Sequence, residues 1–341
     1  MNSKTGPIDL INIGLILLSL FVALKIPFQL FLFSYIILGP LHYMTEIGWL
    51  SQRNFFIREK VPKWPLFALG SLCALVLIYL EFRGVLYDHG IMGGLSEQAD
   101  ERLDNLITSF TFVSFLSIVV FITIQKNVFR FLAIAVLFLI SFFLYNIPWF
   151  LVLFGVMLPT LVHTTIFTGS FMLQGAIKNK STLGYIAFIV FVLAYILIFY
   201  LPIDPAAGQM QVWIQELFLA GEFFVLNYNL FNLFYDASGS QLVLDTGVGL
   251  KIQAFIAFAY TYHYLNWFSK TEVIKWHRIP RKWMIATGLV WLGSVTLHFI
   301  DIKFGIAAIG LLSLLHVYLE FPLNHESFIS IAKALAKGVR I

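Results

Sequence analysis

Apolar runs of about 18 residues or more recur along this chain, and they constrain its fold more than any other feature. As a helix, each run can cross a hydrocarbon layer of about 30 Å, because a helix rises about 1.5 Å per residue. Of the 341 residues, 60% are hydrophobic and 12% are charged, whereas soluble domains carry roughly 25% charged residues. The sequence therefore predicts an all-α fold, a polytopic integral membrane helical bundle.

The length and composition of the apolar runs predict about ten transmembrane helices. The expected spans cover residues 8–24, 26–50, 65–82, 105–124, 128–145, 148–173, 182–202, 248–268, 283–300 and 303–322. The loops between them are short and no low-complexity linker interrupts the chain. Residues 1–341 are therefore expected to form a single transmembrane domain in contact with membrane lipid.

The distribution of Lys and Arg predicts how the bundle is oriented. Basic residues gather in the tail after Ala332 and in loops 51–63, 125–130, 178–180 and 269–282. Loops rich in Lys and Arg face the cytoplasm in multi-pass membrane proteins. We therefore expect a protein of the inner (cytoplasmic) membrane with both termini in the cytoplasm. The net charge of +4 comes from these loops and does not indicate a nucleic-acid partner.

The segment 212–235 is apolar but carries Glu216, Glu222 and three asparagines. If it crossed the membrane once, the basic loop 269–282 would lie outside. We therefore predict a re-entrant or interfacial helix pair, which is tolerated where it packs on protein and not on lipid. A plain eleventh span is the alternative.

Four of the eight histidines, His42, His163, His263 and His316, are embedded in expected spans. In the predicted orientation their helices run in the same direction, and each histidine comes about 14 to 17 residues after the start of its span. This corresponds to roughly 20–25 Å along each helix. A single histidine at this depth is most often a helix–helix hydrogen-bonding group, but four at one depth indicate a shared functional site.

A cluster of neutral imidazoles suits a transition metal, and the single cysteine, Cys73, excludes a disulfide framework and a cysteine metal site. Glu46 follows His42, and Glu320 follows His316, by four residues, which places each carboxylate on the face of its histidine one turn along. Such a carboxylate can orient a ligand by accepting a proton from its second ring nitrogen. Direct metal binding and proton transfer are the alternatives.

The neighbours of the other two histidines are less specific. His163 is followed by the hydroxyls of Thr164, Thr165 and Thr168, but threonines commonly bond to their own helix. Asn266 and Trp267 follow His263 by three and four residues. They are either partners of the site or residues of an aromatic belt at the membrane interface.

The remaining histidines are not expected to be part of the site. His89, His277 and His325 lie in loops or near span ends, where a solvated imidazole needs no explanation. His298 lies near the end of its span beside Asp301, and we expect a wetted pair at the interface.

The order of these motifs resembles the Brp/Blh family, the bacteriorhodopsin-related proteins that include membrane β-carotene 15,15'-dioxygenases. The resemblance rests on four segments, in chain order "GPLHYMTE", "LVHTTIF", "FAYTYHYLNWF" and "LLSLLHVYLEF". Five positions depart from the family pattern. Thr164 and Thr165 follow the second histidine in place of Phe-Gly, Trp267 stands where the family has another histidine, and both acids are Glu in place of Asp.

The resemblance implies a non-haem Fe(II) site to which His42, His163 and His263 contribute, with His316 in the matching late position. It also implies an oxygenase that cleaves the central double bond of a carotenoid with O2 to give two aldehydes. The protein would then be an enzyme that takes a long apolar, lipid-soluble substrate from the membrane.

Two other functions fit the same residues. A bis-histidine haem protein for electron transfer would use the buried imidazoles as axial ligands. A proton-coupled transporter would use Glu46, Glu320, Glu216 and Glu222 as relay groups, with the histidines as protonatable partners.

Overall fold

The structure is a computed structural model that describes residues 6–56, 63–88, 97–144, 147–234, 244, 246–270 and 279–338. These residues form helices, and none of them is in a strand. Within this part of the chain, seven helices are long and apolar enough to cross a membrane. The prediction of an all-α membrane bundle is therefore confirmed.

The chain divides into two compact units. Unit 1 comprises Met1–Thr45, Leu161–Ile306 and Glu326–Ile341, and unit 2 comprises Glu46–Thr160 and Ala307–His325. The expectation of one domain over residues 1–341 stays a prediction.

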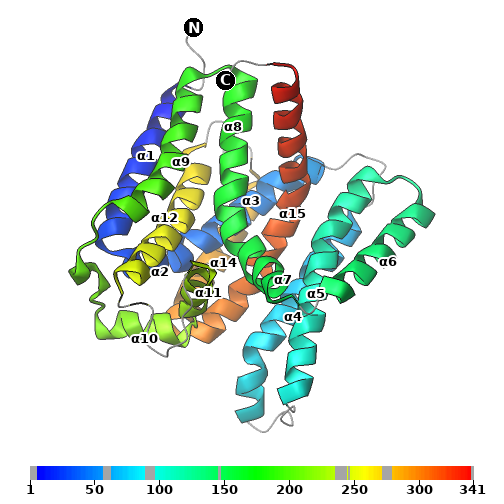
Figure 1. Ribbon diagram of the computed structural model, residues 1–341, viewed down its shortest axis with the longest axis horizontal. Helices are drawn as coiled ribbons and strands as arrows, with labels where there is room; N and C mark the ends of the chain where they lie inside the picture. The colour runs from blue at the N-terminus through cyan, green and yellow to red at the C-terminus, as the bar shows by residue number, and fades with distance from the viewer. Residues whose placement is uncertain are drawn as a thin grey trace. The chain divides into compact units, whose positions relative to one another are not determined.

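Helix α12 (Gly247–Ser269) lies at the centre of unit 1, where α1 (Gly6–Lys25), α2 (Pro27–Phe33) and α9 (Thr182–Tyr200) pack around it. Figure 1 shows α1, α9 and α12 side by side. Of the 23 residues of α12, 15 are buried. Enclosure by protein explains why this helix tolerates more polar residues than the seven candidate spans, which do not include it.

Two spans of the bundle are interrupted by π-helical turns. In the first, η1 (Ser34–Leu38) joins α2 to α3 (Gly39–Ser51). In the second, α7 (Pro148–Leu151) and η3 (Val152–Phe167) lead into α8 (Thr168–Asn179). These helices cover the predicted spans 26–50 and 148–173.

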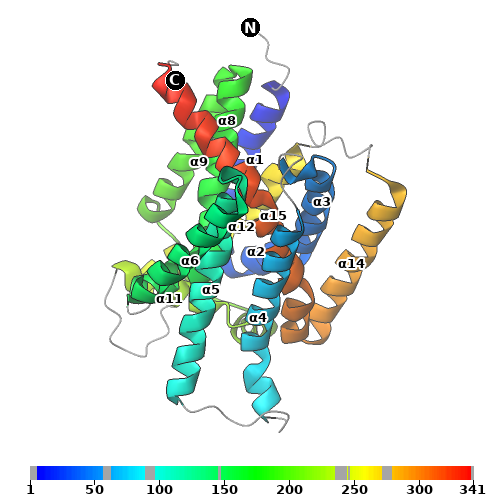
Figure 2. The same ribbon diagram turned by 90° about the vertical axis from the view of Figure 1, so that its right-hand side faces the viewer.

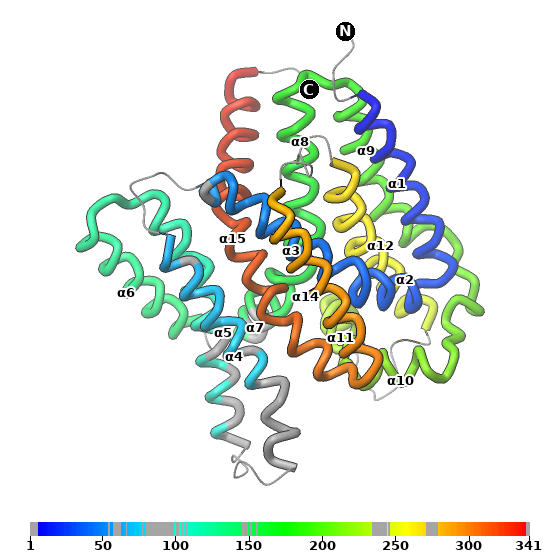
Figure 3. Tube along the Cα trace, turned by 180° about the vertical axis from the view of Figure 1, so that it is seen from behind, coloured from blue at the N-terminus to red at the C-terminus, as the bar shows by residue number. Residues whose placement is uncertain are grey.

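Unit 2 contains α4 (Trp64–Asp88), α5 (Glu97–Thr123) and α6 (Asn127–Leu144), preceded by the short helix η2 (Asn54–Phe56). Helix α5 packs against both α4 and α6 (Figures 2 and 3). Phe112 and Phe150 form part of the core of unit 2. In the same unit, Phe115 stacks on Tyr318 with ring centroids 4.1 Å apart.

The segment 212–235 forms a pair of helices, α10 (Val212–Ala220) and α11 (Phe224–Phe234). At 9 and 11 residues, each reaches about half of the ~30 Å needed to span. Helix α9 ends and α12 begins at the same end of unit 1, so the chain leaves and returns on one side (Figure 1). Asn227 is buried and donates to Gln253 of α12 at 2.8 Å. These observations agree with the predicted helix pair.

The last two helices are α14 (Arg281–Ile300) and α15 (Ile302–Ala336). The predicted span 303–322 ended at Pro322, but the helix continues through this proline to Ala336. At 35 residues α15 is about 52 Å long. The helix therefore extends beyond the predicted span, because a proline removes one hydrogen bond and need not end a helix held by its neighbours.

Figure 1 shows four helix ends on one side of unit 1. They are the start of α1, the turn between α8 and α9, the end of α12 and the end of α15. All of these ends adjoin the termini or the basic loops that we expect in the cytoplasm. Their common side agrees with the predicted topology, while the assignment of that side to the cytoplasm stays a prediction.

Candidate metal centre

The four histidines singled out by their depth, His42, His163, His263 and His316, are all buried. One ring nitrogen from each lies within 4.8 Å of the others, so this cluster of four histidines can bind a metal ion. The first three belong to unit 1 and His316 belongs to unit 2. His42, His163 and His263 define the geometry of the site within unit 1.

His263 on α12 lies between the rings of His42 and His163. Its ring centroid is 4.7 Å from each of theirs, with interplanar angles of 77° to His42 and 67° to His163. The Nε2 atoms of His263 and His42 are 3.0 Å apart. Two ligands at right angles around one ion, with metal–nitrogen bonds of about 2.1 Å, lie about 3.0 Å apart. The spacing suits a hydrogen bond between the two imidazoles and is also compatible with neighbouring ligands of one ion.

The Thr168 hydroxyl fixes the orientation of the His263 ring. Its Oγ1 lies 2.7 Å from Nδ1 of His263. When Oγ1 accepts the Nδ1–H hydrogen bond, the lone pair of Nε2 is directed toward His42. A metal-binding histidine characteristically donates its second ring N–H in this way. Of the three threonines after His163, Thr164 and Thr165 bond the Leu161 carbonyl of their own helix.

The two π-helical segments bring His42 and His163 to the site. Pro40 precedes His42 by two residues and lies two residues after the end of η1, and Pro159 precedes His163 by four residues within η3. Proline has no amide hydrogen for the helical ladder, and π-turns inside helices are frequent at functional sites. These prolines were the sequence signal that the expectation of regular helices overlooked.

Aromatic side chains surround the histidines of unit 1. The Tyr43 and Tyr264 hydroxyls share a hydrogen bond of 2.8 Å, and the Tyr264 ring centroid lies 5.0 Å from that of His42. A Cβ on Gly39 would lie 3.1 Å from the Tyr43 hydroxyl oxygen and 3.3 Å from that of Tyr264. Glycine at this position therefore leaves room for the tyrosine pair. Sequence reasoning singled out neither tyrosine, since both look like ordinary packing residues.

Trp267 and Asn266 have different surroundings. The Trp267 ring lies 5.7 Å from that of His42, and its Nε1–H donates to Thr45 Oγ1 at 2.9 Å. Asn266 instead donates to Asn12 Oδ1 on α1 at 3.0 Å. Trp267 therefore supports the position of His42, whereas Asn266 ties α12 to α1.

Glu46 and Glu320 are both buried, each one turn after its histidine on α3 and α15 respectively. Both belong to unit 2. Burial of a carboxylate at membrane depth is costly and marks a functional group. Their expected role as orienting or proton-transferring groups stays a prediction.

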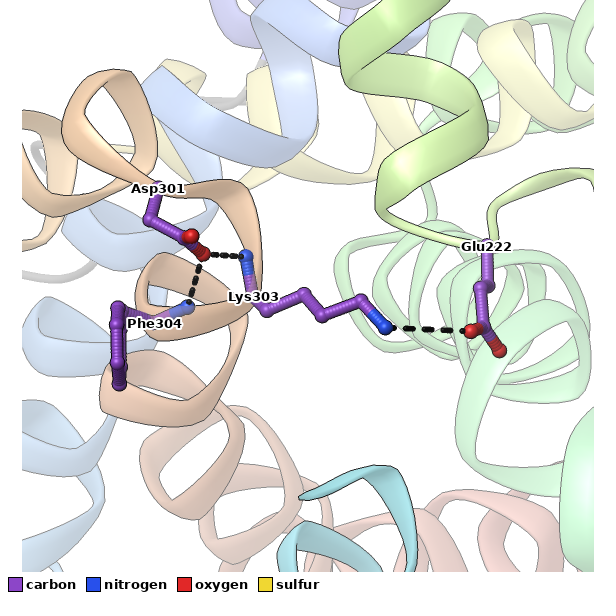
Figure 4. Close-up of polar contacts among 4 residues, drawn as sticks. All are labelled: Glu222, Asp301, Lys303 and Phe304. Atoms are coloured by element: carbon purple, nitrogen blue, oxygen red, sulfur yellow. Dashed lines mark hydrogen bonds and ion pairs between the residues drawn. The ribbon is translucent and has the colours of Figure 1, made fainter. Parts of the chain in front are cut away.

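The expected wetted pair of His298 and Asp301 is wrong. His298 is fully buried, and its Nδ1–H donates to the Ser294 carbonyl at 2.7 Å. Asp301 instead caps α15, where its carboxylate accepts from the backbone amides of Lys303 and Phe304 (Figure 4). An i−4 carbonyl satisfies Nδ1 of His298, while its buried Nε2 has no hydrogen-bond partner among the described residues. His325 is half-buried, while His89 and His277 lie outside the described residues.

The carboxylates of the α10–α11 segment lie at the surface of unit 1. Glu216 is exposed, and Glu222 is 51% exposed and pairs with Lys303 at 3.5 Å (Figure 4). An exposed pair of this kind contributes about 0–1 kcal/mol. Neither carboxylate has the burial of a relay group at membrane depth.

Comparison of the chain with protein-family models, with curated proteins and with solved structures found no match. The chemistry of the histidine cluster therefore carries the functional conclusion.

Proposed function

We propose that this protein is a membrane-embedded, non-haem iron oxygenase that acts on a long apolar substrate such as a carotenoid. The 3.0 Å separation of the two Nε2 atoms of His42 and His263 is the observation that carries the metal site. The apolar helices around it favour a substrate that reaches the site from the lipid. The resemblance to Brp/Blh proteins adds the reaction class.

In this proposal His42, His163 and His263 hold the ion, and His316 supplies a fourth imidazole. Neutral imidazole suits iron as well as copper and zinc, and the family resemblance favours Fe(II). Bound Fe(II) would supply the activation of O2. Thr168 keeps Nε2 of His263 unprotonated, and Glu46 and Glu320 orient ligands or carry protons.

The proposed reaction is cleavage of one carbon–carbon double bond by one molecule of O2. Both bonds of the C=C unit break and each carbon gains one oxygen atom, so that two aldehydes form and no further reductant is needed. The aromatic side chains around His42, including Tyr264 and Trp267, exclude bulk water from this region of unit 1.

The haem alternative fits the cluster less well. Axial ligands lie on opposite faces of a haem, so that their nitrogens are roughly twice a ~2.0 Å bond apart. The 3.0 Å spacing of the His42 and His263 nitrogens is too short for an iron porphyrin between them. The transporter alternative loses support because Glu216 and Glu222 are exposed.

Elemental analysis of the purified protein tests the metal site. We expect about one iron per chain in the wild type, no haem Soret band, and loss of most of the metal in His263→Ala. His298→Gln is the matched control, because His298 is equally buried in unit 1 but outside the cluster, and it should retain the metal. Absence of iron, copper and zinc from the wild type would overturn the proposal.

The reaction class is tested separately with membranes supplied with β-carotene and O2. We expect aldehydes that each carry one oxygen atom from ¹⁸O2, and no product in His263→Ala. A metal-loaded protein that consumes no O2 with any carotenoid or other polyene would refute the oxygenase assignment and leave the metal site.

A further inference from the structure

Helix α14 carries buried polar side chains on the face that packs against η1 in unit 1. Ser294 follows Thr287 by seven residues, or two turns, and His298 follows Ser294 by four, so the three share one face. Their residues are 5%, 5% and 0% exposed. Between them, Trp291 donates its Nε1–H to the Ile37 carbonyl of η1 at 2.8 Å. We call the contact of these four side chains with η1 the α14–η1 seam.

Three side-chain atoms of the seam have no hydrogen-bond partner among the residues that the structure describes. They are Thr287 Oγ1, Ser294 Oγ and His298 Nε2. Serine and threonine inside a helix commonly bond a carbonyl one turn earlier, and buried polar groups in native proteins are normally hydrogen-bonded. The three atoms on this face therefore offer hydrogen bonds to a ligand from outside the chain.

The hydrogen bond of His298 determines which kind of group it can bind. Its Nδ1 lies 2.7 Å from the Ser294 carbonyl oxygen, and because a carbonyl only accepts, Nδ1 carries the hydrogen. Nε2 of the neutral ring is then an acceptor. A Cβ on Gly305 would lie 2.4 Å from Cγ and 2.6 Å from Nδ1 of this ring, so the glycine packs against the Nδ1 side. The remaining acceptor, Nε2, suits a donor such as a hydroxyl group.

Aromatic rings continue from the seam to the histidines of unit 1. The Tyr35 ring meets the His298 ring edge-on at a centroid distance of 6.2 Å, and Tyr260 lies 6.4 Å from Tyr35. Tyr264 lies 6.2 Å from Tyr260 and 5.0 Å from His42. Tyr35 precedes His42 by seven residues, which is roughly 10 Å along the helix. A long apolar molecule with a hydroxyl group at His298 could therefore extend along these rings to His42.

We propose that the α14–η1 seam binds the terminal hydroxyl group of a polyene, with Nε2 of His298 as the acceptor of its hydrogen bond. The rest of the molecule would lie along Tyr35, Tyr260 and Tyr264 toward the histidine cluster. The substrate class of the proposed oxygenase is then the hydroxylated carotenoids, and His298 is a residue that determines specificity. Cleavage of such a substrate rests on the proposed function, whereas its binding does not.

The binding of three matched polyenes to the wild-type protein tests the seam. Zeaxanthin is β-carotene with a hydroxyl group on each end ring, and its dimethyl ether has similar oxygens but no hydrogen to donate. Quenching of tryptophan fluorescence in detergent micelles measures the affinity for each. We expect zeaxanthin to bind about tenfold more tightly than β-carotene, which leaves the buried acceptor unpaired. The ether should bind no better than β-carotene.

Two results with the wild type would overturn the proposal. Equal affinities for the three polyenes would mean that the seam holds water only. Binding of the ether as tight as that of zeaxanthin would mean that Nε2 of His298 does not accept the hydrogen bond.

Variants of α14 assign the preference to His298. His298→Leu removes the acceptor and should bind zeaxanthin and β-carotene equally, whereas His298→Gln retains an amide oxygen and should keep part of the preference. Leu289→Ala is the matched control, because Leu289 is 66% exposed on the same helix, and it should keep the whole preference. An unchanged preference in His298→Leu would contradict the assignment. The comparison of zeaxanthin with its ether needs no variant, so it decides the case in which His298→Leu does not fold.

The binding measurements need neither metal nor turnover, which separates this proposal from the proposed function. A metal-free wild type that prefers zeaxanthin would support the seam and remove the metal site. A metal-loaded protein that cleaves zeaxanthin and β-carotene with the same KM would support the oxygenase and overturn the role of the seam.

Discussion

The hydroxyl of Thr168 bonds Nδ1 of His263 and leaves Nε2 available to a metal. Thr168→Val keeps the shape of the side chain but removes the 2.7 Å hydrogen bond to Nδ1. We expect the affinity for metal to fall about 10–100-fold, as is usual when the partner of a ligating histidine is removed. Titration against a competing chelator measures this loss.

Thr168→Ser is the control for that experiment, because it retains the hydroxyl and should bind metal nearly as well as the wild type. If valine and serine bound metal equally, Thr168 would be a packing residue only.

Trp267 also acts at the scale of a single residue. Trp267→Phe retains an aromatic ring beside His42 but removes the Nε1–H donor to Thr45. We expect the metal to be retained and the stability to fall by about 1 kcal/mol, the net contribution of one hydrogen bond. Thermal unfolding of the purified protein measures the change, and complete loss of metal would show that the indole has a more direct role.

At the scale of elements, the junction of η1 and α3 depends on a residue without a Cβ. Gly39→Ala places a methyl group about 3 Å from the hydroxyls of Tyr43 and Tyr264. We expect a destabilisation of about 1–3 kcal/mol, which is typical of overpacking.

The matched control is Gly293→Ala on α14, where an added Cβ meets nothing within 4 Å. Helix propensity alone predicts that this change is neutral or stabilising by up to about 1 kcal/mol. Equal thermal midpoints for the two variants would mean that Tyr43 and Tyr264 can move away from the added methyl group without loss of stability.

The elements also show what sequence could and could not predict. The positions of the histidines along their spans were predictable, since His42 and His163 each follow the helix starts Pro27 and Pro148 by 15 residues. The length of each apolar run predicts where its span begins, and the depth of a histidine follows from its distance to that start. The π-turns were not predictable from hydropathy. The periodicity of apolar residues indicates which face of a helix is buried, but not which carbonyl accepts the hydrogen bond of a given backbone amide.

Partners of polar groups were equally inaccessible to sequence reasoning. Thr168 and His263 are 95 residues apart, and nothing in the local sequence distinguishes Thr168 from Thr164 or Thr165. His298 was misjudged for the related reason that proximity to Asp301 along the chain does not place two side chains together.

At the scale of the whole molecule, the proposed metal site is a polar centre inside an apolar bundle. The structure supports the bundle through its long apolar helices, and it supports the centre through four buried histidines that can bind one ion. Polar groups held at such depth are costly in hydrocarbon. Their retention is explained if a metal ion is bound there.

The topology belongs to this scale as well. Reporter fusions at Lys180 and at the C-terminus should both report the cytoplasm, because the α8–α9 turn and the end of α15 lie on one side of unit 1 (Figure 1). A fusion at Gln209, between α9 and α10, should report the opposite side. Opposite locations for the first two fusions would contradict the predicted topology.

X-ray absorption spectroscopy of the metal-loaded protein reports the ligands of the proposed ion. We expect three or four imidazole nitrogens at about 2.0–2.1 Å from one transition-metal ion, and loss of this signal in His263→Ala but not in His298→Gln. A shell made only of oxygen atoms, or a wild-type protein that takes up no metal, would contradict it.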